Sequence, residues 1–170
     1  MIYIYNDFAG THTTSIAAAY HLNKLPPNLP LSKEDILQIP YFNELTTKDA
    51  GKLIFHGTDE DDNPVYTIGR RSSKIVVPAL KEMCLLLFEL CDFEEKIIFS
   101  NTSPTVPFMM SIGGLLSRGL GIDSLGVPLL VKGTQKCHSL IQELVEETKR
   151  IGAEEQSEKV VVLENKDFHI

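Results

Sequence analysis

The spacing of apolar residues changes once near the start of the chain. The run from Ile2 to Tyr5 consists of β-branched and aromatic residues, as is typical of a strand. After Gly10, small and apolar residues recur at helical spacing, among them Ile16, Ala19 and Tyr20. The pattern predicts a strand, a polar loop and a helix in succession.

Prolines and turn-forming residues divide the next part of the chain. Three prolines within Leu25–Leu31 end the first helix and favour an extended connection. Ser32 then caps a short helix, with Asp35 at its third position. Further on, two apolar segments flank the polar run Thr58–Pro64, which predicts a β-hairpin.

The central segments alternate between helix and strand patterns. Apolar residues at positions 76, 80, 83, 84, 87 and 88 predict an amphipathic helix, and 96–100 predicts a buried strand followed by a polar turn. Residues 107–119 read as a further helix that contains Gly113 and Gly114. Each glycine costs about 1 kcal/mol relative to alanine in a helix. We therefore expect compensation from close packing against a sheet or a ligand.

The last part of the pattern repeats this alternation. Residues 127–134 predict a strand that ends in a Gly-Thr turn, and 135–151 predict a helix with apolar residues along one side. Strands that alternate with helices indicate a mostly parallel sheet covered on both faces. We expect a three-layer, Rossmann-like or P-loop-like α/β domain over residues 1–151, with an inserted antiparallel β-hairpin. The polar extension 152–170 contains 159–164, which predicts an edge strand or a tail.

Composition limits the class of protein. The 170 residues are 43% apolar, enough for one core without metals or disulfides. Sixteen Lys and Arg against 23 Asp and Glu give a net charge of −7, the wrong sign for a protein that covers nucleic-acid phosphates. The three cysteines contain no CxxC pair, so neither a disulfide framework nor a zinc site is indicated.

Neither a signal peptide nor a membrane span is predicted. The N-terminus lacks the basic, apolar and small-residue zones of a secretory signal. The most apolar stretch, from Ile75 to Leu90, is interrupted by a proline and by charged residues. We expect a cytoplasmic protein that does not bind membranes.

Polar residues follow three of the predicted strands. Ligands of a parallel sheet collect at the carboxyl ends of the strands, where helix N-termini expose unpaired N–H groups. Glycine and small hydroxyl residues let the backbone approach an anion there. The sequence therefore predicts a site for an anionic group such as a phosphate, with candidate ligands in three groups: Gly10, Thr11, His12, Thr13, Thr14 and Ser15; Asn101, Thr102 and Ser103; Lys132, Gly133 and Thr134.

The first loop is weakly similar to a degenerate P-loop. Thr11 to Thr14 stand where one branch of P-loop nucleotidases has Gly-Lys-Thr-Thr before an alanine-rich helix. The two glycines of the motif are absent, and His12 replaces the lysine that reaches the terminal phosphates. No Asp placed to hold magnesium ends a later apolar strand. The pattern argues against a functioning ATPase or GTPase.

His12 is the candidate catalytic residue. The positive end of the helix dipole opposes protonation, so we expect a neutral imidazole that acts as general base, hydrogen-bond donor or nucleophile. The alternative is that His12 only caps the helix or fills a polar niche.

Arg70 and Arg71 are candidates for a bidentate anion clamp, because they follow the hairpin directly. Their alternative is solvated charge or a salt bridge to the acidic run 59–62. That run resembles a cation loop only in composition, since it lacks the spaced ligands of an EF-hand. It predicts a solvated turn, and we predict no metal site and leave the cofactor open.

Several segments together resemble a known family. Residues 6–22, 39–72 and 111–136 are similar to a family of uncharacterised proteins of spore-forming Gram-positive bacteria, domain of unknown function three-one-eight-nine. The resemblance covers roughly residues 1 to 150. The family's first loop usually follows the pattern GG(T/A)HSS, which Gly10 to Thr14 match while Ala9 replaces one glycine. The resemblance implies no particular activity.

Three functions stay open from the sequence, of which the third is a purely structural interaction protein. The first is an enzyme, a hydrolase or transferase, that binds a phosphate-containing small molecule or nucleotide around His12. The second is a non-catalytic regulatory or protein-interaction module with a degenerate phosphate loop. The apolar segment Phe108–Leu120 suits a homodimer face as well as core.

Overall fold

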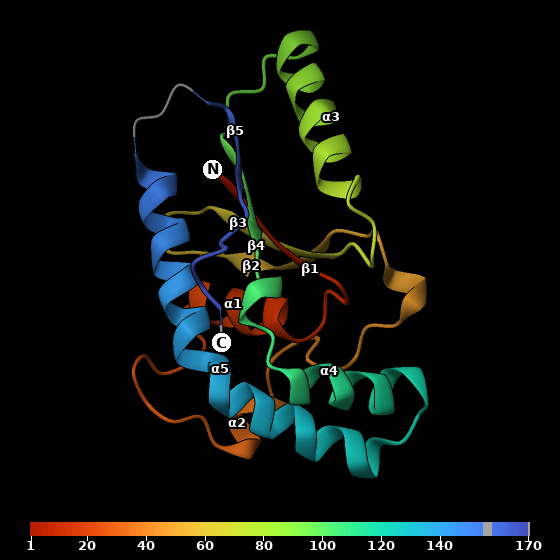
Figure 1. The fold of residues 1–170 in the computed structure, drawn as a ribbon. Helices are drawn as coiled ribbons and strands as arrows, with labels where there is room; N and C mark the ends of the chain where they lie inside the picture. Colours follow the sequence, from red (N-terminus) through yellow and green to blue (C-terminus); the bar gives the residue numbers. More distant parts are fainter. Residues whose placement is uncertain (155–157, 170) are drawn as a thin grey trace.

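A five-stranded sheet in the order β2–β3–β1–β4–β5 forms the centre of the molecule (Figure 1). The computed structural model describes residues 1–154 and 158–169. The strands are β1 (Ile2–Asp7), β2 (Ile54–Thr58), β3 (Pro64–Gly69), β4 (Ile97–Asn101) and β5 (Val160–Leu163).

Three of the four strand pairings are parallel. β1 lies between β3 and β4 and runs parallel to both, and β4 is parallel to β5. Only β2 is antiparallel, to β3, so the predicted hairpin forms one edge of the sheet. The predicted mostly parallel α/β fold is confirmed, and the parallel pairing brings the carboxyl ends of β1, β3 and β4 to the same edge.

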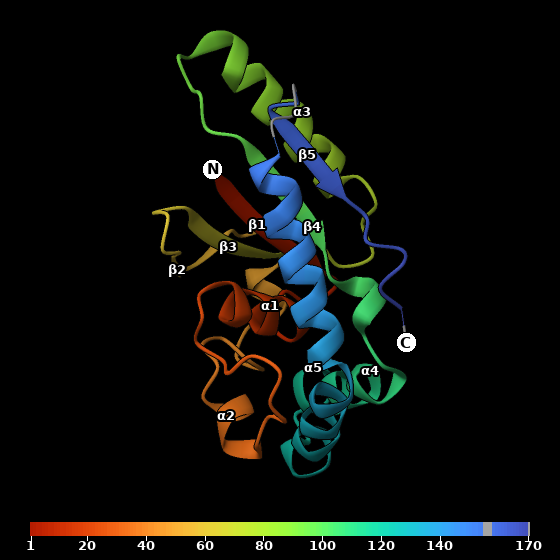
Figure 2. The ribbon, with the colours of Figure 1, turned by 90° about the vertical axis from the view of Figure 1, so that its left-hand side faces the viewer.

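The helices form a layer on each face of the sheet (Figures 1 and 2). Short turns of 3₁₀ helix, η1 (Thr47–Asp49) and η2 (Ser103–Thr105), and a π-helical turn, η3 (Leu115–Gly119), join the longer elements. α1 and α5 pack on one face and α3 on the other. The α-helices are α1 (Thr13–His21), α2 (Lys33–Leu37), α3 (Val76–Leu90), α4 (Phe108–Gly114) and α5 (Asp123–Ala153).

Alternate residues of β1 divide the core into two parts. Tyr3 and Tyr5 point toward α1 and α5 and join the larger apolar cluster. Ile4 points the other way and joins the cluster beneath α3. This alternation is what a strand buried on both faces requires.

The strand predicted over 127–134 is wrong, because these residues lie inside α5. The apolar run with its Gly-Thr pair resembles a strand with a turn. Gly126 and Gly133, however, allow α5 to pack closely against other helices. A side chain at Gly126 would come within 2.6 Å of the backbone nitrogen of Ser117, and one at Gly133 within 2.9 Å of Met110. The close approach of α4 and η3 therefore needs these glycines in α5.

The segment near the C-terminus forms the outer strand β5, which pairs with β4. Residues 155–157 and 170 of the predicted extension lie outside the described residues. Among the helices formed by residues 1–154 and 158–169, none has both the length and the apolar composition that spanning a membrane requires.

Candidate functional site

A cavity of about 530 Å³ lies at the edge of the sheet where β1, β3 and β4 end. Asp7 closes β1, Arg71 follows β3 and Ser103 follows β4, and all three line the cavity. The wall opposite these residues is formed by α4 and η3. Around the whole cavity, the apolar lining includes Phe8, Leu45, Val106, Met110 and Leu115, and the polar lining includes Asp7, His12, Arg71, Ser103, Ser111 and Arg118.

Helix α1 begins at this cavity without a side-chain cap. Its N-cap residue is His12, whose side chain accepts no bond from the first turn. Among the described residues, the backbone N–H groups of Thr11, His12, Thr13 and Thr14 have no hydrogen-bond partner. Thr11 and His12 also line the cavity. The residues that carry two of these unpaired donors, Thr11 and His12, therefore lie at the cavity together with the positive end of the helix dipole.

A carboxylate already occupies part of the loop. Asp7 is 4% exposed and accepts a hydrogen bond from the backbone N–H of Gly10. Thr13 donates its hydroxyl proton to the second carboxylate oxygen of Asp7 at 2.8 Å. Gly10 itself has φ +74°, and a side chain there would come within 2.5 Å of the backbone nitrogen of Gly69. Gly10 and Thr13 thus shape the loop around Asp7.

His12 is held by contacts on three sides of its ring. Nε2 lies 3.2 Å from Oδ1 of Asn43, and the Phe42 ring meets the imidazole edge to face at 5.5 Å between centroids. A side chain at Gly114 would lie 3.1 Å from Cε1. The absence of a side chain at Gly114 therefore lets α4 approach the imidazole closely. This is the close packing that we expected to compensate for a glycine in a helix.

Burial lowers the pKa of His12 below its usual value, so the imidazole is neutral at pH 7. Oδ1 of Asn43 accepts hydrogen bonds, which places the proton of His12 on Nε2 and leaves the lone pair on Nδ1. Asn43 in turn donates from Nδ2 to Ser117 Oγ at 2.8 Å. The Ser117 hydroxyl donates to the carboxylate of Asp123, so the chain of bonds ends on a charge.

The loop that carries Asn43 is held by Thr11. The Thr11 hydroxyl donates to the carbonyl oxygen of Tyr41 at 2.5 Å and accepts from the backbone N–H groups of Glu44 and Leu45 at 3.2 Å each. Tyr41 and Asn43 have φ of +63° and +57°, a region that non-glycine residues seldom adopt. The Thr11 contacts stabilise this backbone, and with it the position of Asn43.

The two predicted arginines have different roles. Arg70 donates to Asn6 at 3.2 Å and to Ser103 at 3.1 Å, so its guanidinium connects the end of β1 to the turn after β4. Arg71 lines the cavity and lies over the ring of Phe8 at 5.5 Å. No carboxylate of the described residues pairs with Arg71. Arg71 is thus the arginine available to an anion.

The remaining predicted site residues lie outside the cavity, apart from Ser103. Thr14 and Ser15 are fully buried on α1, and their hydroxyl oxygens have no partner among the described residues. Thr102 is also fully buried and bonds to Thr13 at 2.9 Å. Asn101 accepts from the backbone N–H of Ser103 at 3.0 Å and stabilises that turn.

The third predicted group does not reach the site. Lys132, Gly133 and Thr134 lie in the middle of α5 instead of at a strand end, and Thr134 is fully buried. The backbone amides of this group therefore belong to helix turns and do not face the cavity.

Three residues of the site were missed by sequence reasoning. Asp7 carried a signal, because it directly precedes the loop at the end of the first strand. The sequence around Asn43 and Arg118 gave no such signal, because both residues reach the cavity region through contacts between segments that are distant in sequence. Arg118 lines the cavity and pairs with Asp123 at 3.1 Å.

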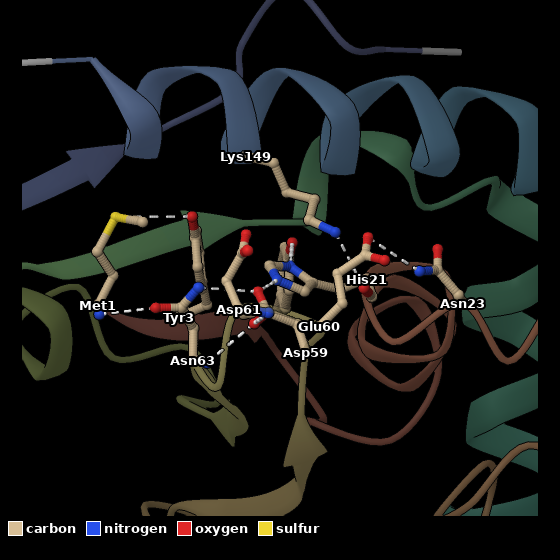
Figure 3. A network of polar contacts seen from close by, with 10 residues as sticks. Met1, Tyr3, His21, Asn23, Asp59, Glu60, Asp61, Asn63 and Lys149 are labelled. Carbon is tan, nitrogen blue, oxygen red and sulfur yellow. Dashed lines mark hydrogen bonds and ion pairs between the residues drawn. The ribbon is translucent and has the colours of Figure 1, made fainter.

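A second polar cluster surrounds His21 at the far end of α1 (Figure 3). His21 Nε2 lies 3.1 Å from Asp59 in the hairpin turn, and Nδ1 lies 2.7 Å from the Tyr5 hydroxyl. Lys149 of α5 donates to the backbone carbonyl of His21 at 3.2 Å. Asp59 also accepts from the backbone N–H of Asn63 at 2.9 Å, so the acidic run forms a turn. The contact between Asp59 and His21 connects this turn to α1.

The described residues contain no group of three or more His, Cys, Asp or Glu side chains placed to hold a metal ion. A family model, described as "Protein of unknown function (DUF3189)", matches residues 2–150. No curated protein and no solved structure matched the chain.

Proposed function

Because the chain belongs to the DUF3189 family, whose description names no activity, we propose a function from the site itself: the cavity binds a small organic anion, such as a phosphate ester or nucleotide. One observation carries the proposal. The same cavity contains His12, the guanidinium of Arg71 and the uncapped start of α1. A guanidinium, a neutral imidazole that can donate or accept a hydrogen bond, and free backbone N–H groups at one cavity favour an anion.

The apolar wall of the cavity indicates the rest of the ligand. Leu45, Val106, Met110 and Leu115 line the space beside the polar residues. A volume of about 530 Å³ suits a small molecule with an apolar portion. The proposed ligand therefore combines an anionic group at the start of α1 with a less polar body against α4 and η3.

His12 supports a catalytic role in this proposal. Its neutral imidazole presents the Nδ1 lone pair, while Asn43 holds the opposite nitrogen. Such a histidine takes a proton from a water or hydroxyl that attacks the bound ester, as a general base. The reaction class would be hydrolysis or group transfer.

A non-catalytic binding module is the second candidate, and Asp7 favours it. The loop N–H of Gly10 and the hydroxyl of Thr13, which a phosphate loop would offer to its ligand, are both engaged by the Asp7 carboxylate. A degenerate phosphate loop of this kind binds an anion without the groups that drive phosphoryl transfer.

Calorimetric titration with inorganic phosphate, AMP and adenosine tests the binding. We expect binding of the anions that exceeds that of the neutral nucleoside, and a loss of roughly tenfold or more in Arg71→Gln. Arg150→Gln is the matched control, since Arg150 lies exposed on α5. Equal affinity in wild type and Arg71→Gln would refute the proposed site. Release of phosphate from esters, abolished in His12→Gln, separates the enzyme from the binding module.

A reducing cytoplasm suits the cysteines and is part of the proposal. Cys84, Cys91 and Cys137 are all free thiols. Burial raises the pKa of Cys137 to about 12, so this thiol in α5 is unreactive at pH 7.

A further inference from the structure

Two apolar residues line the cavity where it opens to solvent. Phe8 and Leu115 are both part of the lining, yet they are 55% and 62% exposed. Phe8 directly follows β1, whereas Leu115 begins η3 on the opposite wall. A side chain that lines a cavity and is also more than half exposed lies at its opening. The opening is therefore bordered by an apolar side chain on each side.

A stripe of exposed apolar side chains runs from this opening along α4. Phe108, Ile112 and Leu115 are spaced i, i+4 and i+7, which places them on one side of the helix over about 10 Å. Phe108 is 80% exposed and Ile112 is 37% exposed. Leu115 belongs both to this stripe and to the lining of the cavity. The apolar lining thus continues onto the surface of the protein.

The interior of the cavity suits a hydrocarbon chain better than a nucleobase. Leu45, Val106 and Met110 line it with apolar side chains. The described residues of the lining include no Asn or Gln, the amide side chains that best match the edge of a base. The polar edges of a base would find few partners there, and each unpaired buried group costs free energy. A hydrocarbon chain carries no polar group, so its burial against this lining is favourable.

We propose that the ligand is an alkyl phosphate, a phosphate monoester with one unbranched hydrocarbon chain, a class that rests on the anion site proposed above. The phosphate lies at the start of α1 beside Arg71, where α1 has no side-chain cap. The chain lies against the apolar lining and leaves the cavity between Phe8 and Leu115. Its far end covers Ile112 and Phe108, so one occupant accounts for the exposed lining and for the stripe.

A freely dissolved ligand is favoured over a membrane lipid of the same chemistry. The protein carries a formal net charge of −7, which opposes its approach to an anionic membrane surface. Cosedimentation with phosphatidylcholine vesicles, with and without phosphatidic acid, distinguishes the two sources. We expect the protein to remain in the supernatant in both cases. Sedimentation that depends on phosphatidic acid would overturn the assignment to a dissolved ligand.

Calorimetric titration with methyl, butyl and octyl phosphate, each below its micelle concentration, measures the contribution of the chain. We expect the affinity to rise by about twofold to fourfold for each added CH₂ group, while AMP binds about as tightly as methyl phosphate. Octanol, which has no anionic group, should bind far more weakly than octyl phosphate. Equal affinities for methyl and octyl phosphate, both weakened in Arg71→Gln, would overturn the hydrocarbon chain but leave the anion site intact. Absence of binding by every phosphate would instead refute the anion site as well.

Replacing Leu115 tests the path of the chain. Leu115→Ser should lower the ratio of octyl phosphate affinity to methyl phosphate affinity by about tenfold, because the octyl chain reaches Leu115 and the methyl group does not. Leu115→Met keeps an apolar side chain and should preserve the ratio. Leu90→Ser is the matched control, since Leu90 is apolar and 73% exposed but lies on α3, outside the lining. An unchanged ratio in Leu115→Ser, or an equal fall in Leu90→Ser, would overturn the proposed path.

Discussion

Nε2 of His12 lies 3.2 Å from Oδ1 of Asn43, and this contact decides which imidazole nitrogen carries the proton. The amide oxygen accepts, so the proton sits on Nε2 and the free lone pair sits on Nδ1. Asn43 is itself oriented by Ser117, whose hydroxyl bonds to Asp123. The tautomer of the candidate catalytic residue thus depends on Asn43, which lies 31 residues away in sequence.

Replacing Asn43 with aspartate should raise the pKa of His12. The wild-type pKa is lowered by burial, and a carboxylate at the same place would stabilise the imidazolium. An NMR titration of the His12 ring should show an increase of about 1 to 3 pH units. Asn23→Asp is the control, because Asn23 bonds to Glu60, away from the cavity, and should leave His12 unchanged. An unaltered titration in Asn43→Asp would contradict the contact.

Adjacent glycines of α4 should respond differently to alanine. A methyl group at Gly114 meets the His12 ring at 3.1 Å, so Gly114→Ala should displace the imidazole and weaken anion binding while the fold persists. A methyl group at Gly113 meets the backbone of Gly126 and Leu130 at 2.9 Å, which forces α4 and α5 apart. Urea unfolding should show Gly113→Ala as the less stable variant, by roughly 1 to 3 kcal/mol. Equal losses of stability would count against this geometry.

Two threonines on either side of the loop–helix junction should behave oppositely when replaced by valine. Thr11→Val removes one hydrogen-bond donor and the acceptor for two backbone N–H groups, so we expect a loss of about 1 to 3 kcal/mol. Faster hydrogen exchange at Glu44 and Leu45 should accompany it. Thr14→Val replaces a buried hydroxyl that has no partner among the described residues and should be neutral or stabilising. A larger loss in Thr14→Val than in Thr11→Val would disprove the assignment.

Stability should fall as the pH drops from about 6.5 to 4. Burial lowers the pKa of His21 to about 4 and that of His56 to about 4, from 6.5. In this range the two histidines bind protons in the unfolded chain but not in the folded protein. Each histidine therefore lowers the free energy of unfolding by up to about 1.4 kcal/mol for every pH unit of acidification. Above pH 6.5 both histidines are neutral in the folded and the unfolded state, so they no longer change the free energy of unfolding with pH. Urea midpoints between pH 4 and 8 measure the slope, which His56→Gln should reduce; an unchanged slope would argue against this origin.

Local patterns predicted most of the fold. The first strand and helix, the hairpin, α3, β4 and the capping box of Ser32 and Asp35 all follow from periodicity or turn chemistry. The prediction for residues 127–134 failed because an apolar run and the Gly-Thr pair after it, interpreted as a strand and a turn, lie within a helix. The reason is tertiary: Gly126 and Gly133 permit a close contact with α4 and η3 that no local pattern records.

The candidate site was predictable only where one loop builds it. His12 and Thr11 line the cavity as expected, because a strand-to-helix turn positions its own residues. The two consecutive arginines could not be told apart, since only the fold directs Arg70 to Asn6 and leaves Arg71 at the cavity. Asn43 reaches His12 through a backbone with positive φ that Thr11 stabilises. Such contacts between distant segments have no signature in the sequence.

Helix α5 has 31 residues, contains Pro128 and changes direction along its length (Figure 1). Near its start Gly126 abuts α4, and near its end Gly152 abuts Tyr3, while Lys96 donates to the carbonyl oxygen of Gly152 at 3.0 Å. Pro128 has no backbone N–H to donate to the helix, which permits such a bend. One continuous helix can therefore pack against α4 near its start and against the sheet near its end.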